Sequence, residues 1–479
     1  MIPLLLIIPL VFALLSVLLP RLPIKAIAIP GLVLQLIASI QLSVHTYKHG
    51  ASDYALGSWE APLGIALHAN GFTVTLLTLT AFIAIVCAVY ALIYLKRYEH
   101  EQRYFWPLFW FLLASLNGIW LSGDLFNLYV GLELLTFSAV GMVALTANKA
   151  SLQAAIRYLF AALLGSLGYL AGVALLYGQY GTLSIQEIAL ISTSDAPTQV
   201  ALALMTVGLL MKTAIFPLHY WLPPAHGGAL APVSALLSAL VVKASFYILA
   251  VLWLQLAPDA ISPAAAQVLG ALGAGAILWG SWCAFRQPDI KMLVAYSTVA
   301  QLGYLMFVFP LSIGTSAAAA ELAWQGTVLH LLAHAFAKAA MFLSVGTLVL
   351  AIGHQGIKDL AGVSHRVPLA LFSFGLSAVS LMGLPPSGGF NAKWLLLQSA
   401  LSSGQWWWFI FILGGGLLTA AYVFRVFSVS FIEEARHKFA PTHWLLDVSA
   451  LTLAAAAILL GFVSQWPLTL MELVPGVQS

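Results

Sequence analysis

The chain has 479 residues, of which 62% are hydrophobic and only 7% are charged. Soluble domains carry about 25% charged residues, so a soluble fold is excluded because it would lack a polar surface. The formal net charge of +3 reflects the basic connections described below and gives no indication of nucleic-acid binding. Apolar runs of about 20 residues, separated by short polar connections, predict an all-α polytopic membrane protein that contacts the lipid bilayer, rather than a β-barrel.

Several kinds of site are absent from the sequence. Cys87 and Cys283 lie in apolar surroundings and match no iron–sulfur or zinc spacing. No phosphate-binding glycine motif is present, so nucleotide binding is not expected. We therefore expect neither a cofactor nor a metal ion. The apolar stretch from Met1 to Pro20 has no basic start and no cleavage site, which indicates a first transmembrane helix rather than a signal peptide.

The hydropathy pattern predicts fourteen spans, at residues 2–20, 26–44, 71–95, 105–122, 125–146, 151–177, 199–220, 229–256, 265–285, 290–312, 322–352, 368–402, 405–431 and 446–465. The run 368–402 is too long for one straight crossing and contains Pro385 and Pro386, so it predicts a broken helix. We divide the chain into an N-terminal three-helix segment (1–103), a first repeat (104–257), a second repeat (258–431) and a C-terminal helix with its tail (432–479).

The basic residues of the connections are strongly biased to one side of the membrane. The connections after odd-numbered spans hold fourteen of them: Arg21, Lys25, Lys96, Arg97, Arg103, Lys149, Arg157, Arg286, Lys291, Lys358, Arg366, Arg425, Arg436 and Lys438. The opposite side holds only Lys48. This bias predicts that the first set is cytoplasmic and that both termini lie on the non-cytoplasmic side of the cell membrane, which is the inner membrane in a cell with two.

Glu133 lies in the middle of the fifth span, with no Lys or Arg within one helical turn. A charged group at the centre of a bilayer costs roughly 2.5–3.5 kcal/mol, so its partner is expected on another helix. The alternative is a protonated Glu133 that only holds two helices together by a hydrogen bond. Asp124 and Asn127 stand at the start of the same span, where helix capping is the simplest interpretation, and Asp124 is also an accessory candidate for the site.

Lys212 lies about 13 residues into the seventh span, too deep to reach the interface easily. Pro217 removes the backbone hydrogen bond to the carbonyl of Thr213 and so loosens the helix beside the amine. Irregular backbone at membrane depth is tolerated where it lines a hydrated cavity. The segment that follows contains His219 and His226, which are accessory candidates. The alternative is a simple helix kink whose lysine extends to the interface.

Lys243 lies at membrane depth in the eighth span. Four more ionisable side chains lie at membrane depth in the second half of the chain. His330, His334 and Lys338 recur every four residues, so they project from one helix face and suggest a proton relay. A lone intramembrane histidine would more often be a satisfied core residue. Lys393 follows the Pro385–Pro386 break, as Lys212 accompanies the break at Pro217.

The two breaks lie five spans apart, in the seventh and twelfth spans. An odd offset reverses the direction of the chain through the membrane. Spans 4–8 and 9–13 are therefore predicted to be inverted five-helix repeats, a design that recurs in ion-coupled transporters.

The chain resembles the antiporter-like subunits shared by respiratory complex I, membrane-bound hydrogenases and multisubunit Mrp cation/proton antiporters. The matching segments are Asp124–Val130 with Glu133, Lys212–His226, Ala231–Ala235 with Lys243, Asp289–Ser297, Gln301–Tyr304, and Gly383–Pro386 with Phe390 and Lys393. The first of these segments and Lys393 are most similar to the Mrp D-type subunit. The segment around Glu133 is more similar to the N-type subunit of complex I.

The resemblance implies a role for each of these positions. Glu133 and Lys212 would be the pair that separates and re-forms during proton transfer, and Lys243 would connect them to the centre. His330, His334 and Lys338 would continue the hydrated path, and Lys393 would end it. The implied function is proton translocation within a Na⁺/H⁺ antiporter, with other membrane subunits as partners and no catalytic chemistry of its own.

Two alternatives remain. The chain would belong to a proton-pumping oxidoreductase if it were a membrane-arm subunit like those of complex I or a membrane-bound hydrogenase. A stand-alone solute carrier would need a pocket for an organic substrate, whereas the ionisable residues of this sequence suggest a charge relay.

Overall fold

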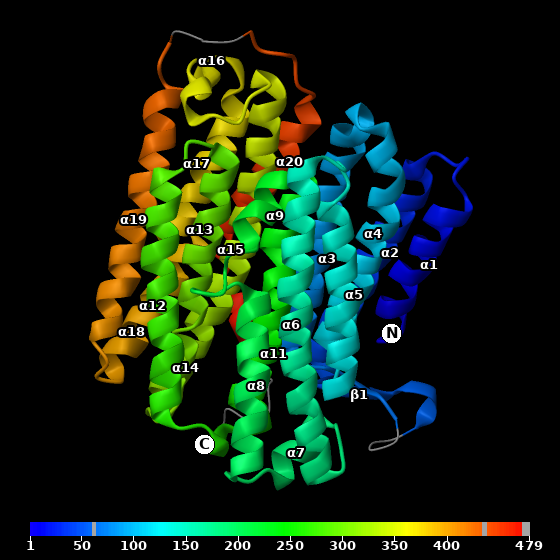
Figure 1. The fold of residues 1–479 in the computed structure, drawn as a ribbon, viewed down its shortest axis with the longest axis vertical. Coiled ribbons are helices and arrows are strands. Elements are labelled where there is room, and N and C mark those ends of the chain that lie inside the picture. The colour runs from blue at the N-terminus through cyan, green and yellow to red at the C-terminus, as the bar shows by residue number, and fades with distance from the viewer. Residues whose placement is uncertain (60–63, 434–437, 472–479) are drawn as a thin grey trace.

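The structure is a computed structural model that describes residues 1–59, 64–433 and 438–471. The helices of this part of the chain run mostly along the long axis of the molecule, with α1 and α2 at one edge and α18 and α19 at the other (Figure 1). Arg436, one of the basic residues of the predicted cytoplasmic connections, lies outside the described residues.

The first half of the chain contains α1 (Leu4–Leu18), α2 (Ile24–His49), α3 (Gly71–Tyr94), α4 (Glu99–Leu121), α5 (Leu125–Val143), α6 (Lys149–Tyr180), α7 (Ile185–Ile191), α8 (Ala196–Thr213), α9 (Leu222–Gly228), α10 (Ala231–Leu236) and α11 (Val242–Val251). The second half contains α12 (Pro263–Arg286), α13 (Ile290–Leu305), α14 (Val308–Ser312), α15 (Ala317–Ile352), α16 (Val363–Arg366), α17 (Pro368–Met382), α18 (Gly388–Ser402), α19 (Trp407–Ser430), α20 (Trp444–Leu459) and α21 (Gln465–Met471). Short 3₁₀ or π-helical pieces are η1 (Leu56–Ser58), η2 (Leu95–Arg97), η3 (Leu237–Val241), η4 (Leu252–Leu256), η5 (Pro258–Ala260) and η6 (Ile357–Leu360).

The predicted all-α membrane fold is confirmed. Within the described residues, 10 helices are long and apolar enough to cross a membrane, and three shorter apolar helices accompany them. Each of the fourteen predicted spans contains at least one helix. The connection between α2 and α3 also forms an antiparallel hairpin of β1 (Ser52–Ala55) and β2 (Ala66–Ala69), which hydropathy did not predict.

Both predicted helix breaks are present. The helix of the seventh span, α8, ends at Thr213 before Pro217, and α9 follows the break; the twelfth span divides into α17 and α18. Ser387 caps the second of these interruptions, since its hydroxyl accepts a hydrogen bond of 3.2 Å from the backbone N–H of Phe390. A further interruption, between α13 and α14, was not predicted.

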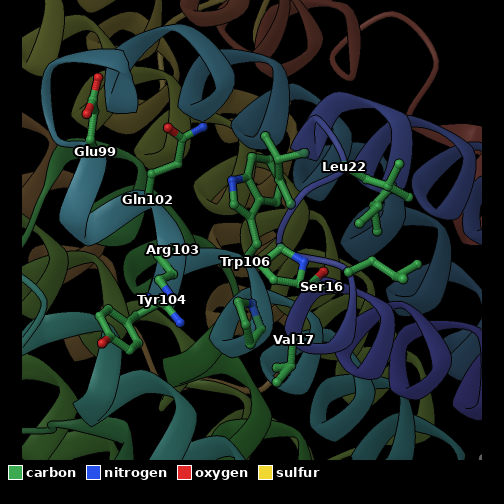
Figure 2. Close-up of a pocket in the computed structure, with 13 residues that line it drawn as sticks. Ser16, Val17, Leu22, Glu99, Gln102, Arg103, Tyr104 and Trp106 are labelled. Atoms are coloured by element: carbon green, nitrogen blue, oxygen red, sulfur yellow. The ribbon is translucent and has the colours of Figure 1, made fainter.

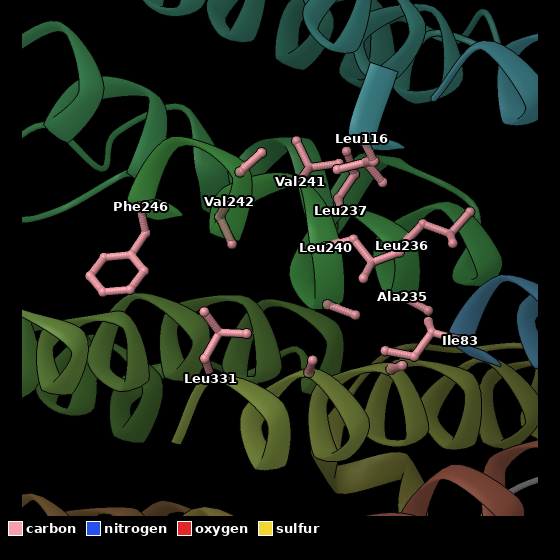
Figure 3. Close-up of a cluster of buried hydrophobic side chains, with 14 of the residues drawn as sticks. Ile83, Leu116, Ala235, Leu236, Leu237, Leu240, Val241, Val242, Phe246 and Leu331 are labelled. Carbon is pink, nitrogen blue, oxygen red and sulfur yellow. The ribbon is translucent and has the colours of Figure 1, made fainter. Parts of the chain in front are cut away.

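The centre of the bundle is the continuous helical segment from Ala231 to Leu256, formed by α10, η3, α11 and η4. Its most apolar 18-residue window is 100% buried inside the protein. Figure 3 shows Ala235 of this segment near Ile83 of α3 and Leu237 near Leu116 of α4, with Leu331 of α15 on a neighbouring helix. This helix is surrounded by protein rather than lipid, so its polar residues face protein partners.

Two matched backbone pairings occur at the starts of the fifth and tenth spans. Asp124, before α5, pairs with Ser184, before α7, and Asp289, before α13, pairs with Gly356, before η6. In Figure 1, α7 lies at the lower end of the molecule and α16, which closely follows η6, lies at the upper end. An inverted repeat with an offset of five spans would produce such pairings. The repeat and the four-part division of the chain stay predictions.

Helices α6 and α8 approach each other closely at two glycines. A Cβ atom on Gly208 would overlap the backbone carbonyl of Gly165, and one on Gly165 would lie 2.7 Å from the carbonyl oxygen of Gly208. Glycine on both sides therefore allows α8 to hold Lys212 against α5 and α6.

We expect Gly208→Val to lower the free energy of unfolding by about 1–3 kcal/mol, since the added atoms must force the two backbones apart. Thermal denaturation of the purified protein measures the effect. Gly178→Val on α6 is the matched control, because a Cβ at Gly178 meets no atom within 4 Å. Equal melting temperatures for the two variants would contradict the close helix contact.

Candidate functional site

Glu133 of α5 and Lys212 of α8 form a buried ion pair between helices. The Lys212 Nζ lies 3.6 Å from Glu133 Oε1, with side-chain exposures of 6% and 15%. The same amine donates a 2.9 Å hydrogen bond to Thr136 Oγ1, and Ser166 of α6 donates to the Glu133 carboxylate. Three helices thus hold the pair, and Lys212 is the partner on another helix that the isolated position of Glu133 predicted.

The backbone opens directly after Lys212. Helix α8 ends at Thr213, and Ala214 adopts a left-handed conformation with φ 58°. The indole N–H of Trp221 donates a 2.8 Å hydrogen bond to the carbonyl of Met211, which also accepts one of 3.2 Å from the backbone N–H of Ala214. The break therefore lies beside the amine, and a side chain satisfies one of its backbone carbonyls.

A small cavity adjoins Lys212. It has a volume of about 10 Å³ and is lined by Leu132, Leu135, Thr136, Tyr158, Ala162, Lys212, Val241 and Ser245. This volume is close to the minimum for one water molecule, and Thr136, Tyr158 and Ser245 can supply hydrogen bonds. The cavity extends from Lys212 towards the central helix that carries Lys243.

Lys243 is the second residue of α11, which follows the π-helical turn η3. Its Nζ donates to the carbonyl oxygen of Ser238, five residues earlier. The Ser238 hydroxyl lies 2.9 Å from Thr298 Oγ1 of α13. Lys243 is consequently linked through Ser238 to α13, which also contacts the next residues of the site.

His330, His334 and Lys338 lie on one face of α15, as their spacing predicts, and α13 contacts this face. Lys338 is fully buried, and its Nζ donates to Ser297 Oγ and, at 3.0 Å, to the carbonyl of Val294. The Nε2 of His330 donates a 3.0 Å hydrogen bond to the carbonyl of Gln301. One face of α13 therefore supplies acceptors along the α15 row.

The two histidine rings of this row are stacked, with centroids 5.8 Å apart and an interplanar angle of 10°. Neither ring nitrogen of His334 has a hydrogen-bond partner in the described part of the chain. A buried imidazole with both nitrogens free is unusual, because most buried polar atoms are satisfied by protein or water. His334 can therefore accept or donate a proton without breaking an existing bond.

Lys393 of α18 closes the row at the second helix break. Its Nζ donates to the carbonyls of Leu381 (2.8 Å) and Met382 (3.2 Å), where α17 ends. The amine lies 4.3 Å from the centre of the Tyr304 ring, and that ring lies 5.1 Å from the His330 ring. Tyr304 thus separates the last histidine from the last lysine.

We call these residues the buried axis: Glu133, Lys212, Lys243, Lys338, His334, His330 and Lys393. Among the described residues, only Glu133 and Lys212 form an ion pair within it. No hydrogen bond joins one lysine of the axis to another in the same part of the chain. Proton movement along the axis would therefore need intervening water or side-chain rotation.

The accessory candidates occupy different positions. Asp124 caps α5, accepting a 2.7 Å hydrogen bond from the backbone N–H of Asn127. His219 stacks on Phe216 with ring centroids 5.8 Å apart. His226 is 1% exposed and stacks on Phe342 of α15, with centroids 4.9 Å apart and its Nδ1 unpartnered in the described structure. Of the three, His226 adjoins the helix that carries the histidine row.

The sequence is similar to those of known membrane proteins over most of its length. The family model described as NADH:quinone oxidoreductase/Mrp antiporter, TM, matches residues 122–419. The chain belongs to this family. The match contains every residue of the buried axis, so the resemblance inferred from the motifs is confirmed.

Relatives of both expected kinds are found for this antiporter-like membrane subunit. It is 36% identical over 386 residues to the N subunit of the NADH-quinone oxidoreductase of Desulforudis audaxviator, covering 79% of this chain and 75% of that protein. It is 31% identical over 440 residues to the D subunit of the Na(+)/H(+) antiporter of Alkalihalophilus pseudofirmus, covering 90% and 87%.

Solved structures share the fold over nearly the whole chain. A chain in the Mrp complex from Dietzia sp. DQ12-45-1b matches with a TM-score of 0.89 and 24% identity, covering 98% of this chain and 96% of that chain. A chain of the archaeal membrane-bound sulfane sulfur reductase matches with a TM-score of 0.90 and 26% identity, again covering 98% and 96%.

The burial of one basic residue in this antiporter-family chain was not predicted. Lys291 counts among the basic residues of the predicted cytoplasmic side, at the start of the tenth predicted span (290–312). The structure places it in the first turn of α13 with 6% exposure. Its Nζ donates to the carbonyl of Ala229, 62 residues away in sequence, so the burial depends on a long-range contact that hydropathy does not register.

The described part of the chain contains no candidate metal cluster, and a surface pocket of this part lies among its N-terminal helices. No group of three or more His, Cys, Asp or Glu side chains among these residues could hold a metal ion. A surface pocket of about 700 Å³ lies between the end of α1, the start of α2 and the start of α4. Figure 2 shows Arg103, Gln102 and Trp106 on its wall. None of the residues that line it belongs to the axis.

Proposed function

We propose that this chain is the proton-translocating membrane subunit of a multisubunit Na⁺/H⁺ antiporter in the cell membrane. The Glu133–Lys212 ion pair beside a broken helix, at one end of a row of buried amines and imidazoles, carries the proposal. Buried charges are costly and structurally replaceable, so several in one bundle indicate a charge pathway.

Proton transfer would begin when Glu133 and the protonated Lys212 separate. The nearby carboxylate stabilises the ammonium, and its withdrawal in a poorly hydrated site favours release of the proton. The released proton would pass through the water-sized cavity towards Lys243 and then along Lys338, His334 and His330 to Lys393. The breaks at Pro217 and Pro385 would admit water at the two ends of this path.

Such a relay needs an energy source outside this chain. We therefore assign it partner membrane subunits, as in the Mrp complex and the membrane-bound reductase whose chains share its fold. In an antiporter the source would be a Na⁺ gradient. The 36% identity to an N subunit supports the second candidate, a membrane-arm subunit of a complex I-like oxidoreductase or a hydrogenase.

Purification of the native assembly and reconstitution into vesicles with an internal pH dye distinguishes the two candidates. We expect an imposed Na⁺ gradient to drive proton movement without any reductant. Proton pumping that instead requires NADH or hydrogen, with no response to Na⁺, would establish the oxidoreductase alternative. A third outcome, with no proton movement under either condition, would refute proton translocation itself.

The orientation is a separate part of the proposal. We expect Lys48, near the end of α2, to react with a membrane-impermeant amine reagent from outside intact cells, and Lys438 to react only in inverted vesicles. Both side chains are exposed. Mass spectrometry of the labelled peptides measures the reaction. The reverse labelling pattern would overturn the assignment of both termini to the non-cytoplasmic side.

A further inference from the structure

Lys291 carries a buried amine that is not part of the buried axis. Its Nζ donates to the carbonyl of Ala229 and lies 3.5 Å from that of Gly227, at the end of α9. It forms no ion pair with a carboxylate in the described part of the chain. Asp289 instead accepts hydrogen bonds from the backbone N–H groups of Lys291 (2.8 Å) and Met292 (3.0 Å). Burial of an ammonium without a contacting counter-charge is costly, so simple anchoring explains it poorly.

The surroundings of Lys291 lead towards the axis along two routes. His226 directly precedes Gly227, whose carbonyl faces the Lys291 amine. The His226 ring stacks on Phe342, which lies one turn beyond Lys338 on α15. On α13, Val294 lies one turn beyond Lys291 and accepts a hydrogen bond from the Lys338 amine. Lys291, His226 and Lys338 are therefore neighbours across three helices.

In the other direction the chain reaches the surface within a few residues. Gln287 and Asp289 are half-buried, and Pro288 between them is exposed. Backbone hydrogen bonds join this turn to the segment after α15, from Ile290 N to Gln355 O (2.9 Å) and from Ile357 N to Pro288 O (2.8 Å). Lys291 thus lies between the aqueous surface at the predicted cytoplasmic connections and the interior at Lys338.

We propose that Lys291 and His226 form a proton port between the buried axis and water on the side of the basic connections. The inference rests on the proposed function. The Lys291 ammonium gives its proton to an unprotonated ring nitrogen of His226, and the resulting neutral amine takes a proton from a hydronium ion of the aqueous phase, which leaves a water molecule. The His226 imidazolium then passes a proton to the neutral amine of Lys338. The complete cycle moves one proton inwards and leaves His226 neutral and Lys291 protonated.

Substitution by arginine separates a port from an anchor. An arginine at this position can still donate to the carbonyls of Ala229 and Gly227, but its guanidinium does not release a proton. We expect Lys291→Arg to assemble with an unchanged melting temperature and to lower Na⁺-driven proton flux in vesicles at least tenfold. If the Lys291 amine only held α9 in place, arginine would preserve function. Near wild-type flux in Lys291→Arg would therefore overturn the proposal of a proton port.

His226→Phe provides a second, independent variant, because it keeps a ring to stack on Phe342 and removes both nitrogens. We expect the same tenfold loss of flux, and wild-type flux in this variant would also overturn the proposal, whether or not Lys291→Arg folds. Lys212→Ala is measured beside both. If Lys212→Ala retains flux, the proposed function fails. If Lys212→Ala abolishes flux while Lys291→Arg retains it, only the port fails.

Discussion

Lys212→Ala is expected to abolish proton-coupled transport while the complex still assembles. The substitution removes the Lys212 amine, which lies 3.6 Å from Glu133 and is the only amine that contacts this carboxylate in the described structure. The same amine donates a hydrogen bond to Thr136, which is also lost. The first proton carrier of the axis is then missing, and no other lysine forms a hydrogen bond within this site among the described residues. Na⁺-driven quenching of a pH dye in vesicles should fall at least tenfold, to the level of vesicles without the complex.

The companion substitution Glu133→Ala is expected to give the same loss for a different reason. It leaves the Lys212 amine in place but removes the carboxylate whose approach and withdrawal control its proton. The matched control is Lys149→Ala, which removes an exposed lysine at the start of α6 and should transport normally. Wild-type transport in both axis variants would end the relay proposal, and equal loss in the control would indicate a nonspecific effect.

The sequence predicted the membrane fold well because the bilayer imposes strong constraints on the chain. A helix that crosses the membrane needs a long apolar run, and prolines at Pro217 and Pro385 interrupt helices for local steric reasons. These signals lie within one segment each. The β1–β2 hairpin and the π-helical turn η3 were missed, because they depend on contacts with other segments and follow no local apolar pattern.

The candidate site was predicted in part. The four-residue spacing of His330, His334 and Lys338 was sufficient to place them on one helix face, and an isolated Glu133 pointed to a partner on another helix. The role of α13 was not predictable, because its contribution is made largely by backbone carbonyls, which carry no residue-specific signal. The burial of Lys291 was not predictable, because it depends on contact with the end of α9, which is distant in sequence.

Lys338→Met is expected to lower proton flux without lowering the stability of the protein. Methionine has a similar length and no charge, so it fills the site while removing an amine that is fully buried without an ion pair in the described structure. Ser297 retains its own 3.1 Å hydrogen bond to the Val294 carbonyl, so no buried acceptor is left unsatisfied there. Replacement of buried charge by apolar side chains of similar volume is neutral or stabilising by about 1–4 kcal/mol. We therefore expect the free energy of unfolding to stay constant or to rise by about 1–3 kcal/mol, while Na⁺-driven proton flux falls at least tenfold.

Thermal denaturation and vesicle flux of the same preparation measure both quantities, with Met341→Leu on α15 as the control that should change neither. A variant that loses stability and flux together would mark Lys338 as a packing residue, and the energetic argument for the buried axis would then fail.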